Sequence, residues 1–487
     1  MQRINIFVSL TLTAGVLLAS CQESAEITET SGQTTVTTAV VDGETAKLSD
    51  NLSEADFNGE VFNIFGERQT TLSDYFFVEE MSGEIIDDSV FLRNKTVEDK
   101  YNVELEFTLV DWDGGANTIK TYTLAGDNSF DLYTCTHLRL GQLIVERYFV
   151  DWQQVDSVDL SLPCYVEKAN ETYSIGDTMP LLYGDFMESN ILRCWHFVFN
   201  KRLAEENNLE DPYTAVREGR WTLDYLMNQI KDVSRDLNGD TLWTVDDLYG
   251  FATDKLATLD ACSRSLGINA IGKDDDNRPV LTYYNDNVPL AFEKLYQLYY
   301  TGNMTYVSED SLAHINDVFA LGNAVFASFR IDQLMNAEIR EMTDDYGVLP
   351  YPKLDESTDG YGTYLSGTFS AQMISVNQPQ ENWHKIGTIV EALNVYSHEL
   401  VLPAIYEVTL KTKTSRDENS IEMLDLILDS RTYSFDSCDE DGFPLSPIKT
   451  LRDLIGWKKS TDIASYYASV EATAQAWIDN MIEAYQG

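Results

Sequence analysis

VELEFTL at residues 103–109 decides the fold, together with VFNIF at residues 61–65. In VELEFTL, apolar residues alternate with Glu and Thr, which is the two-residue period of a strand. Between the two stretches, apolar residues from Ile85 to Tyr101 recur at helical spacing. A strand, a helix and a second strand predict a parallel βαβ unit with a right-handed crossover. The chain is therefore expected to belong to the α/β class.

Similar patterns continue along the rest of the chain. Trp195 and Trp221 are expected in the core. The periodicity predicts a strand at 130–134, a helix after the N-cap Thr222, a helix over 286–300, strands at 324–329, 346–350 and 371–376, a helix over 382–397, and a long C-terminal helix over 462–485.

The N-terminus carries an export signal. Arg3 precedes an apolar run from Ile4 to Leu18, and small residues lead to Cys21. This order is typical of a secretory signal, and a Cys directly after the cleavage position is typical of a bacterial lipoprotein. The run is shorter than the ~20 residues of a spanning helix. Residues 1–20 are therefore predicted to be a lipoprotein signal peptide. Cys21 is predicted to anchor the protein by lipid at the extracellular face of the bacterial cell membrane.

Residues 21–56 are predicted to form a flexible tether. They are rich in Ser, Thr and Glu, lack aromatic residues, and contain Lys47 as their one base. Such a stretch cannot bury enough apolar surface to order itself. As a flexible coil it would span roughly 30–35 Å on average and keep the folded part near the membrane.

The chain is strongly acidic. It has 80 acidic and 34 basic residues, a net charge of −46, and 44% apolar residues. A field of this sign argues against nucleic-acid binding and against basic-residue attachment to anionic lipid. The length suits two to three domains.

Six cysteines are present, and Cys21 is assigned to lipid. Five remain, so at least one is unpaired or pairs between molecules, and no CxxC spacing indicates zinc or redox chemistry. Most are expected to be small buried apolar groups. The five are Cys135, Cys164, Cys194, Cys262 and Cys438.

The sharpest local motif is an acidic loop at residues 236–247. Its oxygen-bearing residues fall at positions 1, 3, 5, 7, 9 and 12 of an EF-hand-type loop, which is the spacing that wraps a calcium ion. Thr241 stands where Gly is usual, and Asp replaces Glu at position 12, so a plain acidic turn is the alternative. The predicted structural calcium ligands are Asp236, Asn238, Asp240, Leu242 (by its carbonyl), Thr244 and Asp247.

Catalytic motifs are absent from the sequence. There is no GxSxG, HExxH, P-loop or GxGxxG, and the five histidines are scattered. With 80 carboxylates, no glycosidase-like pair can be singled out. The chain is therefore expected not to be an enzyme and to need no catalytic cofactor.

Several motifs resemble one known family. They occur in the family's order: NKRL at 200–203, WTLD at 221–224, the loop and strand at 236–250, FALGNAVF at 319–326, and TLKTK with RDENS at 409–420. The chain resembles, over residues 57–487, the extracellular solute-binding proteins of bacterial ABC importers, in the family that includes maltose- and oligosaccharide-binding proteins.

The resemblance implies two α/β lobes, joined by a hinge that the chain crosses three times and with the ligand between them. Residues 57–188 and 362–405 would form lobe 1, and residues 189–361 and 406–487 would form lobe 2. The crossings would fall near Glu188, Leu365 and Tyr406.

Ligand-binding loops are expected at the carboxyl ends of strands. Maltose-binding relatives carry a Trp-rich segment after the strand that corresponds to 324–329, and its absence here puts maltodextrin-type stacking in doubt. The predicted ligand-binding residues are Glu67, Arg68, Tyr75, Thr136, His137, Arg139, Glu188, Phe329, Arg330, Asp332, Ser366, Gly367 and Tyr406.

The resemblance implies that the protein captures a small solute, expected to be a sugar or oligosaccharide, and delivers it to ABC permease subunits as a monomer. Two alternatives remain open at this point. A surface carbohydrate hydrolase would share the lipoprotein signal and the acidic, aromatic-rich composition. A scaffold or adhesion lipoprotein would bind no small molecule.

Overall fold

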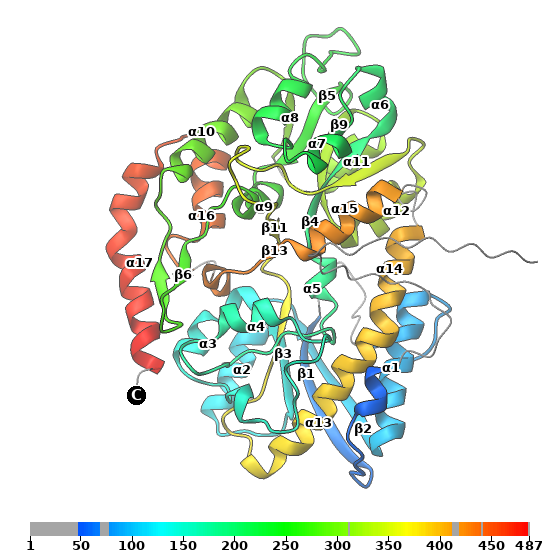
Figure 1. Cartoon of the computed structure of the whole chain (residues 1–487), viewed down its shortest axis with the longest axis vertical. Coiled ribbons are helices and arrows are strands. Elements are labelled where there is room, and N and C mark those ends of the chain that lie inside the picture. The colour runs from blue at the N-terminus through cyan, green and yellow to red at the C-terminus, as the bar shows by residue number, and fades with distance from the viewer. Residues whose placement is uncertain (1–46, 69–76, 310–311, 412–417, 440–441, 486–487) are drawn as a thin grey trace, which may run out of the picture. The chain divides into compact units, whose positions relative to one another are not determined.

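The computed structural model describes residues 47–68, 77–309, 312–411, 418–439 and 442–485 (Figure 1). Helices and strands alternate along this part of the chain, and most strands belong to two larger sheets. The predicted α/β class is therefore confirmed.

The first sheet has four strands in the order β12-β3-β1-β2. β1 (Glu60–Arg68) is parallel to β2 (Val103–Asp111) and to β3 (Leu132–Thr136), and β12 (Ser370–Met373) is antiparallel to β3. α1 (Ile85–Tyr101) connects β1 to β2. The strand–helix–strand order that the sequence predicted is therefore confirmed, and it lies within a parallel arrangement.

The second sheet has five strands in the order β10-β4-β9-β5-β8. β5 is parallel to both β8 and β9, while β4 is antiparallel to both β9 and β10. These strands are β4 (Trp195–Asn200), β5 (Tyr249–Asp254), β8 (Thr305–Ser308), β9 (Ala324–Arg330) and β10 (Tyr346–Leu349).

α8 (Leu223–Ile230) shows how local sequence shapes this second lobe. The hydroxyl of Thr222 accepts a hydrogen bond from the Tyr225 backbone N–H (3.2 Å), so the predicted N-cap is confirmed. The helix packs closely on β5 because Gly250 has no Cβ to meet Ile230.

The chain passes between the two sheets three times. It leaves the first sheet through α5, returns from β10 through β11, and leaves again through a long helical run interrupted by a π-helical turn. These elements are α5 (Ser189–Leu192), β11 (Thr363–Tyr364), α13 (Gln380–Tyr396), the π-helical turn η5 (Ser397–Val401) and α14 (Leu402–Lys411). This is a two-lobe fold with a three-crossing hinge, as expected.

The C-terminal part adds helices to both lobes. α15 (Glu418–Asp429) packs against β10, and β13 (Arg431–Thr432) pairs with β11. The long α17 (Ile463–Tyr485) packs against α10 (Asn287–Tyr300) and α3 (Gly141–Val145). The predicted C-terminal helix is therefore confirmed.

The remaining elements connect these parts. The helical ones are α2 (Gly115–Leu124), α4 (Glu167–Tyr173), α6 (Lys201–Glu206), α7 (Pro212–Arg217), α9 (Ala257–Ser265), α11 (Leu312–Ala320), α12 (Ala337–Glu341), α16 (Pro447–Leu451), η1 (Leu48–Asn51), η2 (His137–Arg139), η3 (Trp152–Gln154), η4 (Ile331–Met335), η7 (Phe435–Cys438) and the π-helical η8 (Arg452–Trp457). A small hairpin consists of β6 (Ile271–Lys273) and β7 (Pro279–Leu281).

The end of the predicted tether differs from expectation. Residues 47–56 are part of the folded body: Ser49 donates to both carboxylate oxygens of Glu399, from its N–H (2.9 Å) and its hydroxyl (2.8 Å), and Leu52 is buried. A few apolar and polar contacts thus hold a stretch whose composition indicated disorder. The predicted signal peptide and Cys21 lie outside the described residues. Among the described residues, no helix combines the length and the apolar character needed to cross a membrane.

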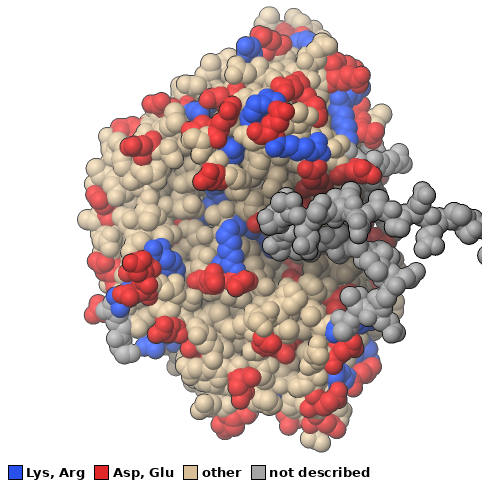
Figure 2. All heavy atoms as spheres, in the orientation of Figure 1, with Lys and Arg blue, Asp and Glu red and all other residues tan. Residues whose placement is uncertain are grey.

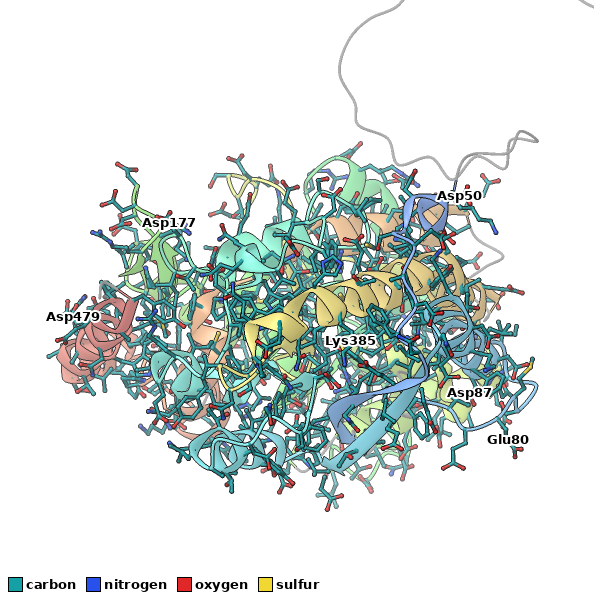
Figure 3. All side chains as sticks on the ribbon, turned by 90° about the horizontal axis from the view of Figure 1, so that it is seen from below. Asp50, Glu80, Asp87, Asp177, Lys385 and Asp479 are labelled. Atoms are coloured by element: carbon teal, nitrogen blue, oxygen red, sulfur yellow. The ribbon has the colours of Figure 1, made fainter. Side chains whose placement is uncertain are left out.

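Charge is spread over the surface. Asp50, Asp87, Asp177 and Asp479 lie at the outside of the body in Figure 3. On the face shown in Figure 2, acidic side chains are scattered and basic ones stand among them. The five described cysteines (Cys135, Cys164, Cys194, Cys262 and Cys438) are all buried and free.

Candidate functional site

The carboxyl ends of the parallel strands in the two sheets are connected through residues 365–369. Leu365 forms a bridge with Cys194, just before β4 of the second sheet. The Gly367 carbonyl accepts a hydrogen bond from Leu138 (3.0 Å), just after β3 of the first sheet. Residues 137–139, 188–195, 330–332 and 365–369 together form the junction between the two sheets. Ligands of α/β folds bind at such carboxyl ends.

Three charged side chains form an ion-pair network in the junction. Asp332 accepts from Arg193 (Nη1 to Oδ2, 2.7 Å) and from Arg330 (Nε to Oδ1, 3.0 Å). The side chains of Arg193 and Asp332 are only 4% and 2% exposed, so the pair is largely withdrawn from water. One carboxylate thus serves two guanidinium groups, one at the end of α5 and one at the end of β9.

Arg330 also lies beside an aromatic ring. Its guanidinium carbon is 5.9 Å from the ring centroid of Trp195, its pairing partner between β9 and β4. The Trp195 indole N–H is buried and has no hydrogen-bond partner in the described part of the chain. The second sheet therefore presents a cation and an aromatic ring together at its carboxyl edge.

The first sheet presents a similar pair. Trp112 directly follows β2, and Arg139 lies at the end of η2. The guanidinium carbon of Arg139 is 4.3 Å from the ring centroid of Trp112, and Arg139 Nη1 donates to the Trp112 carbonyl (2.8 Å). Trp112 is 36% exposed, so part of the indole is open to solvent.

A third pair stands after β5. Lys255 Nζ lies 5.4 Å from the ring centroid of Trp457 and pairs with Glu309 (2.6 Å), which follows β8. Trp457 is 52% exposed. Exposed indole faces next to charged groups suit a saccharide, whose ring has an apolar face and whose hydroxyls need polar partners.

Two ion pairs tie the first and third crossings together. Glu188 accepts from buried Arg93 (2.7 Å), which also donates to Ser397 in η5 (3.1 Å). Burial raises the pKa of Glu188 to about 7, although Arg93 opposes the rise. Next to it, His398 lies 2.7 Å from Asp185, and this hydrogen bond raises the pKa of His398 above its usual value.

Glu67 and Thr136 fasten the ends of β1 and β3 to each other. The Glu67 carboxylate accepts from the Thr136 N–H (2.7 Å), from the Thr136 hydroxyl, and from the Gly115 N–H (2.9 Å). Burial raises the pKa of Glu67, and these hydrogen bonds oppose the rise. Gly115 is required because a Cβ there would overlap Glu67. Both predicted ligand-binding residues hold the sheet edge in place.

His137 and Phe329, both predicted as ligand contacts, lie at core positions in the structure. His137 is buried between Tyr183 (2.6 Å, Nδ1 to the hydroxyl) and Ser437 (3.1 Å, Nε2 to Oγ), and burial lowers its pKa to about 3. Phe329 is fully buried and packs edge-to-face on Phe319, with centroids 5.5 Å apart. Each follows a strand as expected but faces the interior, which strand position alone does not reveal.

The other predicted positions differ in exposure. Ser366 is half-buried, and its hydroxyl is 3.0 Å from that of Thr368. Tyr406 is half-buried on α14, where burial raises its pKa to about 12. Arg68 ends β1, and nothing is described of its side chain; Tyr75 lies outside the described residues.

In the Asp236–Asp247 loop, the carboxylates accept hydrogen bonds from backbone N–H groups of the loop itself. Asp236 accepts from the N–H groups of Gly239 (2.6 Å) and Thr241 (2.8 Å). Asp247, fully buried, accepts from those of Leu237 (3.0 Å) and Thr244 (2.8 Å) and so clasps the two ends of the loop.

The middle of the loop follows the same pattern. Asp240 accepts from the Leu242 N–H (2.7 Å), and Asn238 from the Asp240 N–H (2.9 Å). Thr241 adopts a φ of +68°, the left-handed conformation for which Gly is usual at this position. Nowhere in the described ranges do three His, Cys, Asp or Glu side chains gather as a metal site, and calcium stays a prediction.

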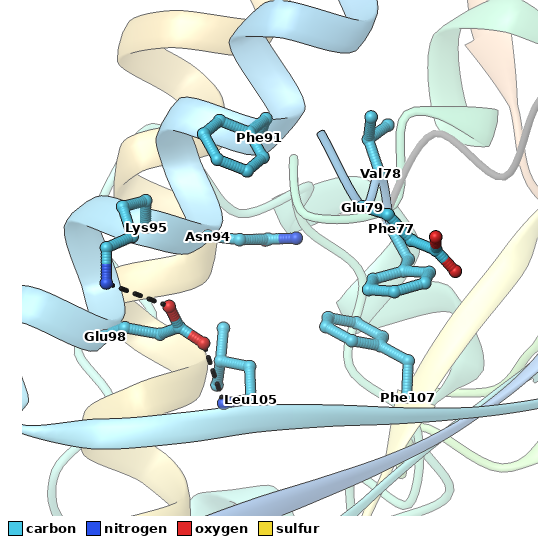
Figure 4. Close-up of a pocket in the computed structure, with 9 residues that line it drawn as sticks. All are labelled: Phe77, Val78, Glu79, Phe91, Asn94, Lys95, Glu98, Leu105 and Phe107. Atoms are coloured by element: carbon cyan, nitrogen blue, oxygen red, sulfur yellow. Dashed lines mark hydrogen bonds and ion pairs between the residues drawn. The ribbon is translucent and has the colours of Figure 1, made fainter. Parts of the chain in front are cut away.

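A separate cavity lies between α1 and β2 (Figure 4). It has a volume of about 380 Å³, and the rings of Phe77 and Phe107 stack there 4.7 Å apart. It is lined by Phe77, Val78, Glu79, Phe91, Asn94, Lys95, Glu98, Leu105 and Phe107. None of these belongs to the junction.

Sequence reasoning missed Trp112, Trp457, Lys255 and Arg193. The rule that placed the other candidates, that ligand contacts follow strands, also points to Trp112 and Lys255. Trp457 and Arg193 reach the sheet edges only through tertiary packing, and no local motif marks them.

No protein-family model and no curated protein matches the chain. Solved structures do match its fold. An ABC transporter solute-binding protein from Thermotoga lettingae, bound to α-D-tagatose, is 12% identical with a TM-score of 0.54; the match covers 87% of this chain and 100% of that one. UgpB from Mycobacterium tuberculosis, in complex with glycerophosphocholine, is 12% identical with a TM-score of 0.56 over 86% and 99% of the two chains.

An ABC substrate-binding protein from Listeria monocytogenes, in complex with cycloalternan, is 12% identical with a TM-score of 0.51 over 87% and 98% of the two chains. The chain therefore has the two-lobe fold of ABC solute-binding proteins. These similar structures are binding proteins, which fits a protein without catalytic motifs.

Proposed function

We propose that this chain is a membrane-tethered extracellular solute-binding protein that captures a sugar or oligosaccharide between its two lobes and delivers it to an ABC importer. One observation carries the proposal: exposed aromatic rings, each beside a cation, lie at the carboxyl edges of both sheets. Trp112 stands at the first sheet, and Trp457 at the second. A ligand held by both would join the two lobes.

The hinge gives this capture its mechanics. Three chain segments cross between the sheets, and two of them are tied by the Arg93–Glu188 and Asp185–His398 pairs. Closure about such a hinge removes the ligand from water, which strengthens its polar contacts. The similar structures with tagatose and cycloalternan support saccharides as the first ligands to test.

A thermal-shift screen against mono- and oligosaccharides tests the proposal. A ligand present at 100 times its Kd raises the free energy of unfolding by about 2.7 kcal/mol. We expect at least one saccharide to raise the Tm without being converted into a product. No shift with any saccharide would contradict the proposal, and product formation would favour a hydrolase.

Tryptophan variants locate the site. Trp112→Ala and Trp457→Ala should each weaken saccharide binding about tenfold or more, because each removes a stacking face. Trp243→Ala is the matched control, since Trp243 is 38% exposed but lies in the Asp236–Asp247 loop. Equal losses in all three variants would argue against a site at the carboxyl edges of the two sheets.

The membrane tether is a second part of the proposal. The signal sequence supports lipid attachment at Cys21, and a flexible tether would raise the effective concentration of a monomeric binding protein at its permease. Cys21→Ser should release the protein into the medium and remove the mass of the lipid. Retention on cells with an unchanged mass would contradict the anchor.

Calcium in the Asp236–Asp247 loop is a third part. The spacing of oxygen ligands supports it, and the ion would act as a structural clip. Calcium should raise the Tm of the protein and a chelator should reverse this. Asp240→Asn should weaken the effect. If neither calcium nor a chelator changes the Tm, this part of the proposal is contradicted.

A further inference from the structure

We infer that the captured saccharide is anionic, with its acidic group bound by Arg330 and Arg139 and its ring on Trp112. The inference rests on the proposed function and names the chemical class of its ligand. It follows from two cations at the carboxyl edges of the two sheets whose charges the surrounding protein does not fully neutralise.

Arg330 is the first of these cations. Only its Nε contacts a carboxylate, Asp332, whose other oxygen is taken by Arg193. The two terminal nitrogens of Arg330 therefore have no acceptor among the described residues. The side chain is 13% exposed, so the guanidinium is mostly covered by protein but still reaches solvent. An entering anion would supply the acceptors that the described protein groups do not provide.

Arg139 is the second cation. Its Nη1 donates to a backbone carbonyl, that of Trp112, and no ion pair joins it to a carboxylate within the described ranges. The guanidinium is positioned by the indole at a centroid distance of 4.3 Å, and it is half-buried. Arg139 is held in place by an aromatic ring and not by a countercharge.

Arg139 and Arg330 differ from several other arginines of this acidic chain. With 80 acidic and 34 basic residues, most cations can find a carboxylate. Arg220 contacts two, Glu210 and Glu218, and Arg202 likewise contacts Glu206 and Asp344. Arg139 has no carboxylate of its own and Arg330 shares one, and both stand where the fold places its ligand, whereas Arg147 and Arg235, which also contact only uncharged acceptors, lie elsewhere.

The chemistry of the ligand follows from the geometry of these groups. A guanidinium offers paired N–H donors that match the oxygens of a carboxylate or sulfate. Trp112 offers a flat face for a sugar ring. Residues 366–367 connect the two edges, so one oligosaccharide would contact both. Bulk salt screens the −46 net charge beyond about 8 Å, and these local charges therefore govern binding.

Matched ligand pairs test the inference by isothermal titration calorimetry on the intact protein. The acidic probes are trimers of galacturonate, glucuronate and mannuronate, each compared with its methyl ester, which keeps the ring but removes the charge. A sulfated disaccharide, with its unsulfated form, is the second acidic source. Maltotriose, cellotriose and mannobiose are the neutral probes. At least one acidic probe should bind tenfold or more tightly than its neutral counterpart.

Variants assign that preference to the two arginines. Arg330→Gln and Arg139→Gln should each reduce the preference for the acidic form about tenfold and leave the Kd of the neutral form nearly unchanged. Arg330→Lys should restore part of it. Arg278→Gln is the matched control, because Arg278 is exposed and pairs with Asp276 on the small hairpin. Equal unfolding free energies would show that the variants remain folded.

The outcomes separate the inference from the proposed function. A preference for carboxylate or for sulfate supports the inference and identifies the source of the charge. If neutral saccharides bind as tightly as acidic ones, the inference is overturned and the proposed function is unaffected. The same conclusion follows if the preference for acidic saccharides is unchanged in both arginine variants. Absence of binding by every saccharide overturns both.

Discussion

The junction and the Asp236–Asp247 loop are both rich in charged and polar groups. The groups of the loop find their partners nearby in the sequence, whereas those of the junction find theirs far away in it. In the loop, Asp236 and Asp247 accept hydrogen bonds from backbone N–H groups no more than ten residues away. In the junction, Arg193 pairs with Asp332 across 139 residues of sequence, and Arg93 pairs with Glu188 across 95. The loop is a local structure, whereas the junction exists only in the folded protein.

The comparison shows where charge affects stability and where it serves binding. The loop carboxylates fix one turn, and a change there should be felt locally. The junction charges are withdrawn from water, so removal of one partner leaves another uncompensated.

Asp332→Ala should cause the largest loss of stability. It leaves Arg193 and Arg330 without their shared carboxylate in a buried setting, and such a change costs about 3–5 kcal/mol. Urea unfolding measures it. Glu422→Ala is the matched control: its partner Arg217 is 40% exposed, and the exposed pair is worth about 0.2–1 kcal/mol. Similar losses in both variants would remove the distinction.

Glu188 should make stability depend on pH. Its pKa is about 7 in the folded protein against an ordinary value of 4.5, because burial disfavours the charged form. The folded state therefore holds more protons than the unfolded chain in this range, and the free energy of unfolding falls as pH rises from about 4.5 to 7.

Glu188→Gln should flatten that dependence. His398, whose pKa is also raised, contributes a fall of the same sign above pH 6.5 and remains in both proteins. Denaturant unfolding at a series of pH values measures the two slopes. A variant with the wild-type slope between pH 4.5 and 7 would show that Arg93 offsets the effect of burial and leaves Glu188 with an ordinary pKa.

Asp247→Asn should weaken the loop by about 1–3 kcal/mol. The amide offers one carbonyl oxygen where the carboxylate offers two, so a backbone N–H of Leu237 or Thr244 loses its acceptor in a buried position. Hydrogen exchange should quicken at residues 236–247 and stay unchanged in the junction. Faster exchange at both would mean that the loop is coupled to the binding site.

Thr241→Gly should have the smallest effect, a gain in stability of about 0.5–1 kcal/mol. A β-branched residue in the left-handed conformation is strained by about 1–2 kcal/mol, and the greater freedom of unfolded glycine offsets part of the relief. Thermal unfolding with and without calcium measures it. A loss of stability would indicate that the threonine side chain makes a compensating contact.

The same contrast explains how much could be predicted from sequence. Periodicity located β1, α1 and β2, because each is encoded by neighbouring residues. Thr222 was found as an N-cap for the same reason. The loop at 236–247 was also found from spacing alone, since its hydrogen bonds are local.

The junction could be predicted only in part. Arg139, Arg330 and Asp332 were predicted as ligand contacts because they follow strands, and the structure places them in the junction. His137 and Phe329 also follow strands, yet their side chains pack into the core. The direction in which such a side chain points depends on residues distant in the sequence, such as Phe319 for Phe329. The arrangement of Arg193 beside Asp332 follows from the pairing of β4 with β9, which no local pattern encodes.

The free, buried thiols provide chemical reporters of conformational opening. Cys194 and Cys438 are completely buried: the backbone of Cys194 forms a β-bridge with Leu365 at the hinge, and the Cys438 sulfur is 3.2 Å from Nε2 of His137, which follows β3 of the first sheet. Burial raises the pKa of both thiols, so neither reacts while it is covered. Their alkylation rates would therefore measure how often the protein around each thiol opens, without any added label. A ligand that holds the lobes together should slow the alkylation of both thiols.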